Sequence, residues 1–213
     1  MIAHPEHSRI RVVEGTIPVL ISAPHTRPIA MKSRDGGSIT KPAELRVARL
    51  LRRTCRKTGA WGIYMGGEGR MEHWEESTFR AYKRVLRSIV EQHNIALFID
   101  LHGFMEARPF AVDYDFKISK RKPYEKETVR LEHIILKHLT SHDMGAPISK
   151  TFFSKENGIA RKTLTYFTRR AFDIPAVQFE INKSVRDDPE TLRKLSKALY
   201  NIVKEWEAED TSR

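Results

Sequence analysis

The stretch Ala96-Leu97-Phe98-Ile99-Asp100-Leu101-His102-Gly103 decides the fold of this chain. Its apolar run has the length of a β-strand, and continuous apolar residues are typical of a strand that is buried on both faces of a parallel sheet. The run ends in Asp100, His102 and Gly103, and the carboxyl ends of such strands are where open α/β sheets bind their ligands. We therefore expect a central strand that delivers polar side chains to a functional site.

The same pattern occurs twice more. Residues 18–25 are apolar until they end at His25, and residues 175–182 carry Glu180 and Asn182 at the end of an apolar run. Predicted strands and helices alternate along the chain, which favours a sheet covered by helices on both sides. We expect an α/β fold in which residues 1–213 form a single three-layer α/β/α sandwich domain with a mixed, mostly parallel sheet.

Three helix boundaries follow from capping signals. Thr40 is a candidate cap for a helix that runs to Lys57, and Gly59 is expected to end it. Asp188 is expected to cap the final helix, with Pro189 at its first position.

Composition fits a soluble globular protein, with 40% hydrophobic and 31% charged residues. The single cysteine, Cys55, excludes an internal disulfide framework and a cysteine-rich zinc site. No apolar run is long enough to span a membrane, and the first residues lack the apolar core of a secretory signal, so we expect a cytoplasmic protein. The net charge of +11 fits a nucleic-acid surface, an enzyme that attracts anionic substrates, or a surface that favours solubility.

Histidines and a glutamate at three strand ends suggest a metal-dependent hydrolase. A mononuclear zinc hydrolase needs three protein ligands and an open position, and a further carboxylate must act as the base. Glu180 is a candidate for that base because a glutamate within an apolar run is rarely an ordinary surface residue, although an ion pair with Lys183 is the alternative. Asp100 is the second catalytic candidate: it shares a strand face with His102 and would orient the imidazole or bind a second metal.

The third metal ligand is less certain from the pattern. Glu44 is the best candidate, and its alternative role is a favourable interaction with a helix dipole. Glu72 and His73 are a rival source of ligands.

Three motifs occur in order between residues 19 and 185: Pro24-His25, Asp100-Leu101-His102-Gly103 with Arg108-Pro109-Phe110, and Phe179-Glu180-Ile181-Asn182. They resemble those of N-formylglutamate amidohydrolase and its relatives, in the wider zinc-carboxypeptidase-like fold class. The resemblance implies one Zn²⁺ ion held by His25, Glu44 and His102, with Glu180 as the general base. In one respect this chain departs from the pattern: relatives with a His-x-x-Glu motif carry an acid where this chain has Pro28.

The expected activity is zinc-dependent hydrolysis of an amide bond in a small acidic acyl-amino acid, such as an N-formylglutamate-like substrate. Candidate substrate-binding residues are Arg161, Arg108, Arg80 and Asn182, because arginine forms forked contacts with carboxylates. The alternatives are a nucleic-acid-binding protein that uses the arginine-rich helix at residues 46–57, or a metal-free binding relative of the family. That helix lacks interleaved aromatic residues, so we do not expect a nucleic-acid partner. We expect no membrane partner, and the oligomeric state stays open.

Overall fold

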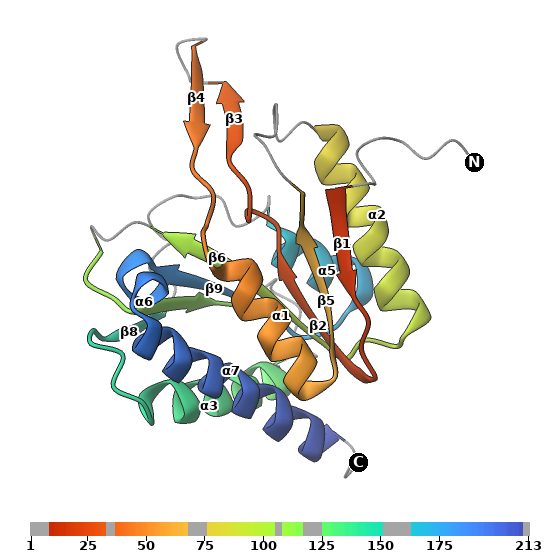
Figure 1. The fold of residues 1–213 in the computed structure, drawn as a ribbon. Helices are drawn as coiled ribbons and strands as arrows, with labels where there is room; N and C mark the ends of the chain where they lie inside the picture. The colour runs from red at the N-terminus through yellow and green to blue at the C-terminus, as the bar shows by residue number, and fades with distance from the viewer. Residues whose placement is uncertain are drawn as a thin grey trace.

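The structure is a computed structural model that describes residues 9–32, 37–67, 76–104, 108–116, 125–150 and 163–210. Its main sheet has seven strands in the order β1-β5-β2-β6-β9-β7-β8. Their bounds are β1 (Ile10–Val13), β2 (Ile17–Ala23), β5 (Ala60–Met65), β6 (Leu97–Phe104), β7 (Val112–Asp115), β8 (Ile148–Lys150) and β9 (Ala176–Asn182). A second, two-stranded sheet pairs β3 (Ile29–Lys32) with β4 (Ser38–Lys41) and projects from the top of the molecule in Figure 1.

The main sheet is mixed and mostly parallel, as predicted. Strands β5, β2, β6 and β9 are joined by parallel pairings, and so are β7 and β8. The pairings of β1 with β5 and of β7 with β9 are antiparallel. The stretch that contains Asp100 and His102 thus forms the middle strand of the sheet, between β2 and β9.

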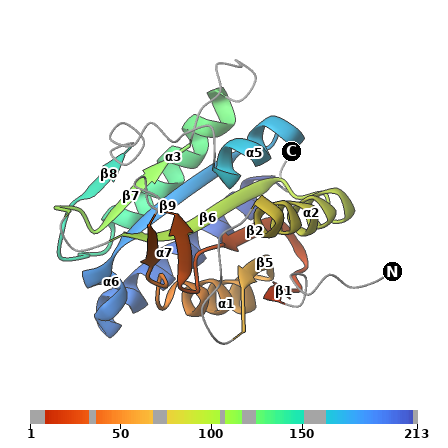
Figure 2. The same cartoon turned by 90° about the horizontal axis from the view of Figure 1, so that it is seen from above.

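Helices cover both faces of this sheet and give the predicted three layers. One face packs against α1 (Val47–Thr58), α3 (Glu125–Thr140) and α7 (Pro189–Asp210), and the other against α2 (Glu76–Gln92) and α5 (Leu164–Phe172). The short helix α6 (Lys183–Asp187) connects β9 to α7. Figure 2 shows α1 and α2 on opposite sides of β2. Strand β6 contributes to both layers, because Leu97, Ile99 and Leu101 belong to the first core and Phe98 to the second.

The capping signals gave one wrong boundary and two correct ones. Thr40 does not cap a helix: it lies within β4, where residues 38–41 pair with β3, and α1 begins only at Val47. Gly59 ends α1 in a left-handed conformation with φ of 84°, as glycine readily does. Asp188 accepts a hydrogen bond from the Thr191 amide at 2.7 Å at the start of α7.

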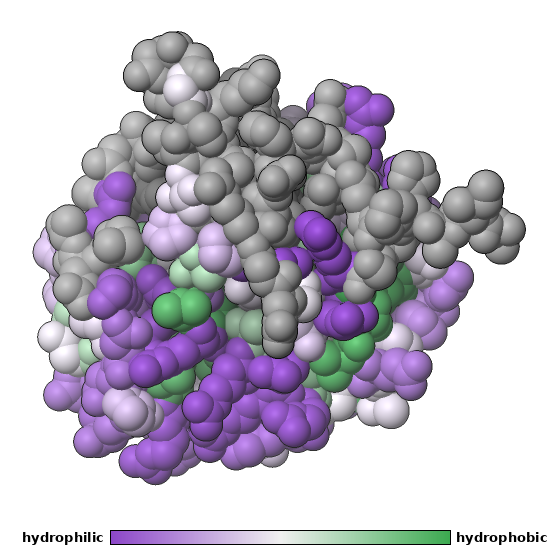
Figure 3. Space-filling model, turned by 45° about the horizontal axis from the view of Figure 1, so that its top comes forward, coloured by the Kyte–Doolittle hydropathy of each residue, from purple (hydrophilic) through white to green (hydrophobic). Residues whose placement is uncertain are grey.

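The outer surfaces of the helices are strongly polar. Hydrophilic side chains dominate the lower part of the face in Figure 3, where the surfaces of α1 and α7 lie. On α1, Arg49, Arg52 and Arg56 face outward, while Leu50 and Leu51 are buried against the sheet. None of the described helices combines the length and the apolar character that crossing a membrane requires.

Candidate metal centre and active site

One face of the main sheet changes from apolar to polar along its strands. On the face covered by α2 and α5, the strands begin with residues such as Leu20, Phe98 and Ala176. Alternate residues of a strand share a face, and the residues that follow on this face are buried and polar. They are Ser22 on β2, Asp100 and His102 on β6, Gln178, Glu180 and Asn182 on β9, and Asp113 and Asp115 on β7. Burying polar groups costs free energy unless they are hydrogen-bonded, paired with a charge or bound to a metal, so this layer is the candidate functional region.

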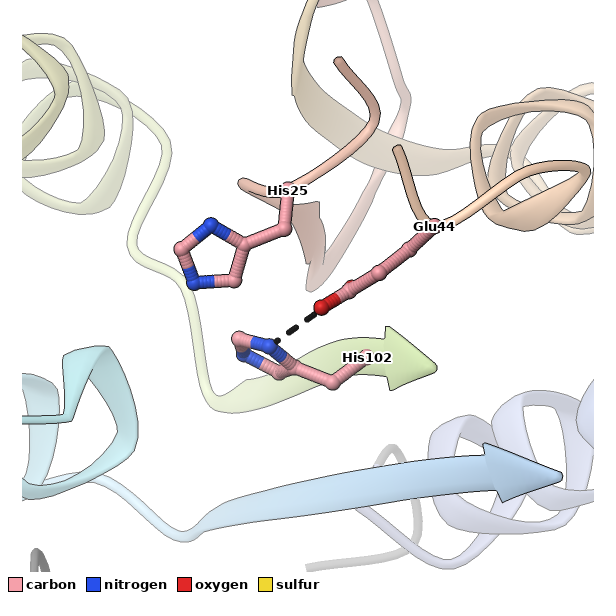
Figure 4. A group of neighbouring side chains, drawn as sticks. All are labelled: His25, Glu44 and His102. Atoms are coloured by element: carbon pink, nitrogen blue, oxygen red, sulfur yellow. Dashed lines mark ion pairs between the residues drawn. The ribbon is translucent and has the colours of Figure 1, made fainter. Parts of the chain in front are cut away.

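Three predicted metal ligands meet at the edge of this polar layer. His25 follows β2, Glu44 precedes α1, and His102 lies on β6; Figure 4 shows their side chains pointing toward one another. Each offers a donor atom, and these atoms lie within 4.8 Å of one another. Glu44 is 4% exposed and His102 9% exposed, so these two donors are shielded from bulk water, while His25 is half-buried.

The β3–β4 hairpin brings Glu44 to His25 despite their separation in sequence. The chain leaves the sheet after His25, forms the antiparallel pair β3–β4, and returns so that the Glu44 amide donates to the His25 carbonyl at 2.9 Å. This hydrogen bond sets the two residues side by side. In relatives with the His-x-x-Glu motif the acid lies three residues after the histidine, where this chain has Pro28. Here the hairpin brings a more distant acid, Glu44, next to His25 instead.

Asp100 orients His102. The Nε2 atom of His102 lies 3.0 Å from Oδ2 of Asp100, which is fully buried. The other ring nitrogen, Nδ1, lies 3.8 Å from Oε2 of Glu44. When Nε2–H donates to Asp100, the lone pair of Nδ1 faces the other donors, which is the arrangement that metal-binding histidines use. Of the two predicted roles for Asp100, the geometry supports orientation of the imidazole over binding of a second metal.

The site attracts positive charge. Burial lowers the pKa of His102, but the carboxylates of Asp100, Glu44 and Glu180 act in the opposite direction and raise the pKa to about 9. At neutral pH the metal-free protein therefore holds a proton on this imidazole. Two imidazoles and a carboxylate are also a donor set that zinc prefers, so the residues fit a bound zinc ion.

We expect zinc binding to release close to one proton near pH 7. The imidazole of His102 must be neutral to bind a metal, so the apparent affinity should fall about tenfold for each pH unit below 9. Calorimetry in two buffers with different protonation enthalpies measures this proton release, which should disappear above pH 9. The folding stability of the metal-free protein should have the opposite pH dependence. The protonated imidazole of His102 contributes its full stabilisation below pH 6.5, and this contribution is lost as the pH rises through about 9. Zinc affinity that does not change between pH 6.5 and 8.5 would contradict this prediction.

Glu180 lies beside His102, and Gln178 holds its side chain in place. It pairs with His102 across the β6–β9 register and is 6% exposed. Gln178 donates from Nε2 to Oε1 of Glu180 at 2.6 Å. Lys183, the predicted alternative partner, contacts Asp187 at 2.7 Å. Sequence reasoning missed Gln178, although its position two residues before Glu180 on the same strand face was a usable signal.

Two further buried polar groups were also missed. Asp113 lies opposite Glu180 in the β7–β9 register and is 2% exposed. Tyr82 of α2 is fully buried, donates to the Ile63 carbonyl at 2.7 Å, and lies 3.0 Å from the hydroxyl of Ser22, the neighbour of Asp100 across β2 and β6. In the sequence, the spacing of Tyr82 predicts only that it belongs to the apolar face of a helix, and does not indicate its hydrogen bonds near the site.

The predicted substrate-binding residues are not gathered in the same way. Asn182 is buried; its Nδ2 donates to the carbonyls of Arg108 and Phe110 at 3.0 and 2.7 Å, and its Oδ1 accepts from the Ser184 amide. These contacts hold the loop at residues 108–110 against the end of β9, and the role of Asn182 toward a substrate stays a prediction. Arg108 is half-buried in that loop, and Arg80 is exposed on α2. Their roles toward a substrate stay predictions.

Some predictions fall on residues that the structure does not describe. Arg161 lies outside the described residues, as do the rival ligands Glu72 and His73. The three donors that the structure does bring together are the set implied by the family resemblance.

The fold is shared with solved structures of amidohydrolases and metallo-carboxypeptidases. Among solved structures, N-formylglutamate amidohydrolase from Ralstonia eutropha superimposes with a TM-score of 0.61 and 13% identity, over 95% of this chain and 99% of that chain. A gene product of Agrobacterium tumefaciens gives a TM-score of 0.63 and 11% identity, over 96% of each chain. A bacteriophage poly-gamma-glutamate hydrolase gives 0.58 and 12%, over 92% of this chain and 88% of that chain.

These similarities confirm the predicted resemblance at the level of the fold. No protein-family model and no curated protein sequence matches the chain. The likeness therefore lies in the three-dimensional fold and not in the sequence.

Proposed function

We propose that this protein is a zinc-dependent amidohydrolase that cleaves an amide bond of a small acidic acyl-amino acid. The observation that carries the proposal is the meeting of His25, Glu44 and His102, whose donor atoms lie within 4.8 Å of one another beside Glu180. A purely structural role would not require three ionisable side chains from three separate segments at one buried point.

His25, Glu44 and His102 would hold the zinc ion. When bound, zinc supplies Lewis-acid polarisation of a carbonyl group and lowers the pKa of water. Asp100 keeps His102 in the tautomer that presents Nδ1 to the site. Glu180, steadied by Gln178, accepts the proton of the attacking water and passes it to the departing amine.

Two observations support an acidic substrate. The chain carries a net charge of +11, which favours the approach of anions. Among the solved structures with this fold, the names of two proteins state that they act on N-formylglutamate and on poly-gamma-glutamate. Arg108 is one candidate for binding such a substrate, because its backbone carbonyl accepts a hydrogen bond from Asn182, two residues after Glu180 on β9.

We expect the loss of the substrate-binding arginine to affect acidic substrates far more than neutral ones. A charge-assisted contact with a carboxylate contributes about 1.5–3 kcal/mol, which corresponds to roughly a ten- to hundredfold rise in KM. The measurement compares N-formylglutamate with N-formylglutamine for the wild type and for Arg108→Ala, Arg80→Ala and Arg161→Ala.

Arg87→Ala is the control, because Arg87 lies on the exposed side of α2, 3.7 Å from Glu91. Equal effects on both substrates in all three variants would argue against carboxylate recognition. A wild type that hydrolyses neither substrate with zinc bound would argue against the proposed substrate class.

A further inference from the structure

Arg186 of α6 is a buried cation that neither the sequence pattern nor the proposed chemistry uses. It is 5% exposed, and its guanidinium donates to three backbone carbonyls. Nε donates to Ile181 at 3.1 Å, Nη1 to Leu45 at 3.2 Å and Nη2 to Phe104 at 2.9 Å. Three carbonyl acceptors from three segments are an unusual use of one arginine, since arginine usually reaches carboxylates or phosphates.

The three carbonyls belong to the segments that carry the site. Ile181 directly follows Glu180 on β9, and Leu45 directly follows Glu44 before α1. Phe104 ends β6, the strand that carries His102. Strands β6 and β9 are already paired in the sheet, but the segment of Glu44 lies outside the sheet. Arg186 therefore fixes the Glu44 segment against the two strands.

We propose that Arg186 is a positioning residue that holds Glu44 in register with His102 and Glu180, and so sets the affinity of the site for a metal ion. The inference rests on the proposed function, because it assumes that these residues bind zinc. Arg186 acts through the backbone and does not contact the reacting atoms. Residues that orient metal ligands in this way typically change metal affinity about ten- to hundredfold.

The glycine after His102 supports this role. A Cβ atom on Gly103 would lie 2.7 Å from Cζ and 2.8 Å from Nε of Arg186. The guanidinium thus packs directly on the backbone of β6, where only glycine leaves room. The group cannot move away without breaking its hydrogen bonds to the three segments, so the observed position of Arg186 requires a glycine at residue 103.

A second arginine, Arg46, joins the same two segments: Arg186 donates from α6 to Leu45, and Arg46 donates from the Glu44 segment to α6. Nη1 of Arg46 donates to the carbonyl of Arg186 at 2.8 Å and also to that of Asp187. Arg46 has φ of 68°, a left-handed conformation that costs a non-glycine residue roughly 1 kcal/mol or more. The contacts between residues 45–46 and α6 therefore hold the turn after Glu44 in a conformation that it would not adopt alone.

The positive charge of Arg186 also lies close to carboxylates of the site. Burial lowers the pKa of Arg186, while Glu44, Asp187 and Glu180 act in the opposite direction. Arginine stays protonated in proteins, so this positive charge is permanent.

The test measures zinc affinity of the full chain by competition with a chromophoric chelator, together with thermal unfolding of the metal-free protein. Arg186→Met keeps much of the side-chain volume but removes the donors, and should weaken zinc binding about ten- to hundredfold. Arg186→Lys, which keeps the charge but reaches fewer carbonyls, should give an intermediate loss. Gly103→Ala, which displaces the guanidinium, should weaken zinc binding although Arg186 is present.

Arg169→Met is the matched control. Arg169 is also 5% exposed and donates to the Phe116 carbonyl and the Thr128 hydroxyl, neither of which belongs to the three site segments. This variant should lower the unfolding temperature while leaving zinc affinity within about twofold of the wild type.

Zinc affinity of Arg186→Met equal to that of the wild type, in folded protein, would overturn the inference while leaving the proposed function intact. An equal loss of affinity in Arg169→Met would also overturn it, because general destabilisation would then explain the effect. If Arg186→Met does not fold, the zinc affinities of Gly103→Ala and Arg186→Lys test the inference: values equal to that of the wild type would overturn it. A wild type that binds no zinc would overturn the metal centre itself, and the inference with it.

Discussion

Replacing Glu180 by glutamine should lower kcat about a hundred- to ten-thousandfold, the range that a general base typically supplies, while zinc content, fold and KM should change little. Glutamine keeps the shape of the side chain and an oxygen that accepts from Gln178, but it does not take up a proton. Steady-state kinetics of the zinc-loaded protein, with metal analysis of the same sample, measures both quantities.

Glu91→Gln is the control for this substitution, since Glu91 is an exposed residue of α2 that lies 3.7 Å from Arg87. Retained activity in Glu180→Gln would reduce Glu180 to a structural residue. Loss of zinc would instead make Glu180 a metal ligand and leave Asp100 or Glu44 as the base.

Replacing either His25 or His102 by alanine should abolish high-affinity zinc binding. Structural zinc sites with four ligands bind with about 10–16 kcal/mol, so one ligand accounts for roughly 2.5–4 kcal/mol, or about a hundred- to thousandfold in affinity. His25→Ala and His102→Ala should each show this loss in a chelator competition assay, with a matching loss of activity.

His138→Ala is the matched control for the histidine variants. His138 lies on α3, 2.7 Å from Glu205 of α7, and should affect stability without affecting zinc. Full zinc content in both His25→Ala and His102→Ala would place the metal elsewhere, and His73 would then be the first residue to test.

The central sheet is predictable from the sequence because its signal is local. Continuous apolar runs in β2, β6 and β9 end in polar residues, and parallel strands bring their carboxyl ends to one edge. This pattern is sufficient to place His25, His102 and Glu180 near one another, and the spacing of Asp100 and His102 is sufficient to put them on one strand face.

The position of Glu44 is not predictable in the same way. Threonine suits both a helix cap and a strand, and at Thr40 the pairing of β4 with β3 prevails over the capping preference. The contact between Glu44 and His25 depends on the return path of this hairpin, a long-range feature that residue spacing does not encode.

The role of Arg186 is even harder to predict from the sequence. Its acceptors are backbone carbonyls, which every residue carries, so no motif marks them. The only local sign is Gly103, which follows His102 within a strand where glycine weakens packing. A glycine there indicates that another group approaches the backbone closely.

The placement of β6 at the centre of the sheet also bears on how the chain assembles. One edge of β6 pairs with β2, which precedes it in the chain, and the other with β9, which follows much later. During synthesis, therefore, the edge of β6 that β9 will cover remains open until residues 176–182 have been made. Unpaired strand edges promote association between chains, so this interval is when the protein is most exposed to misassembly. The arrival of β9 ends that exposure and in the same step brings Glu180, the proposed base, beside His102.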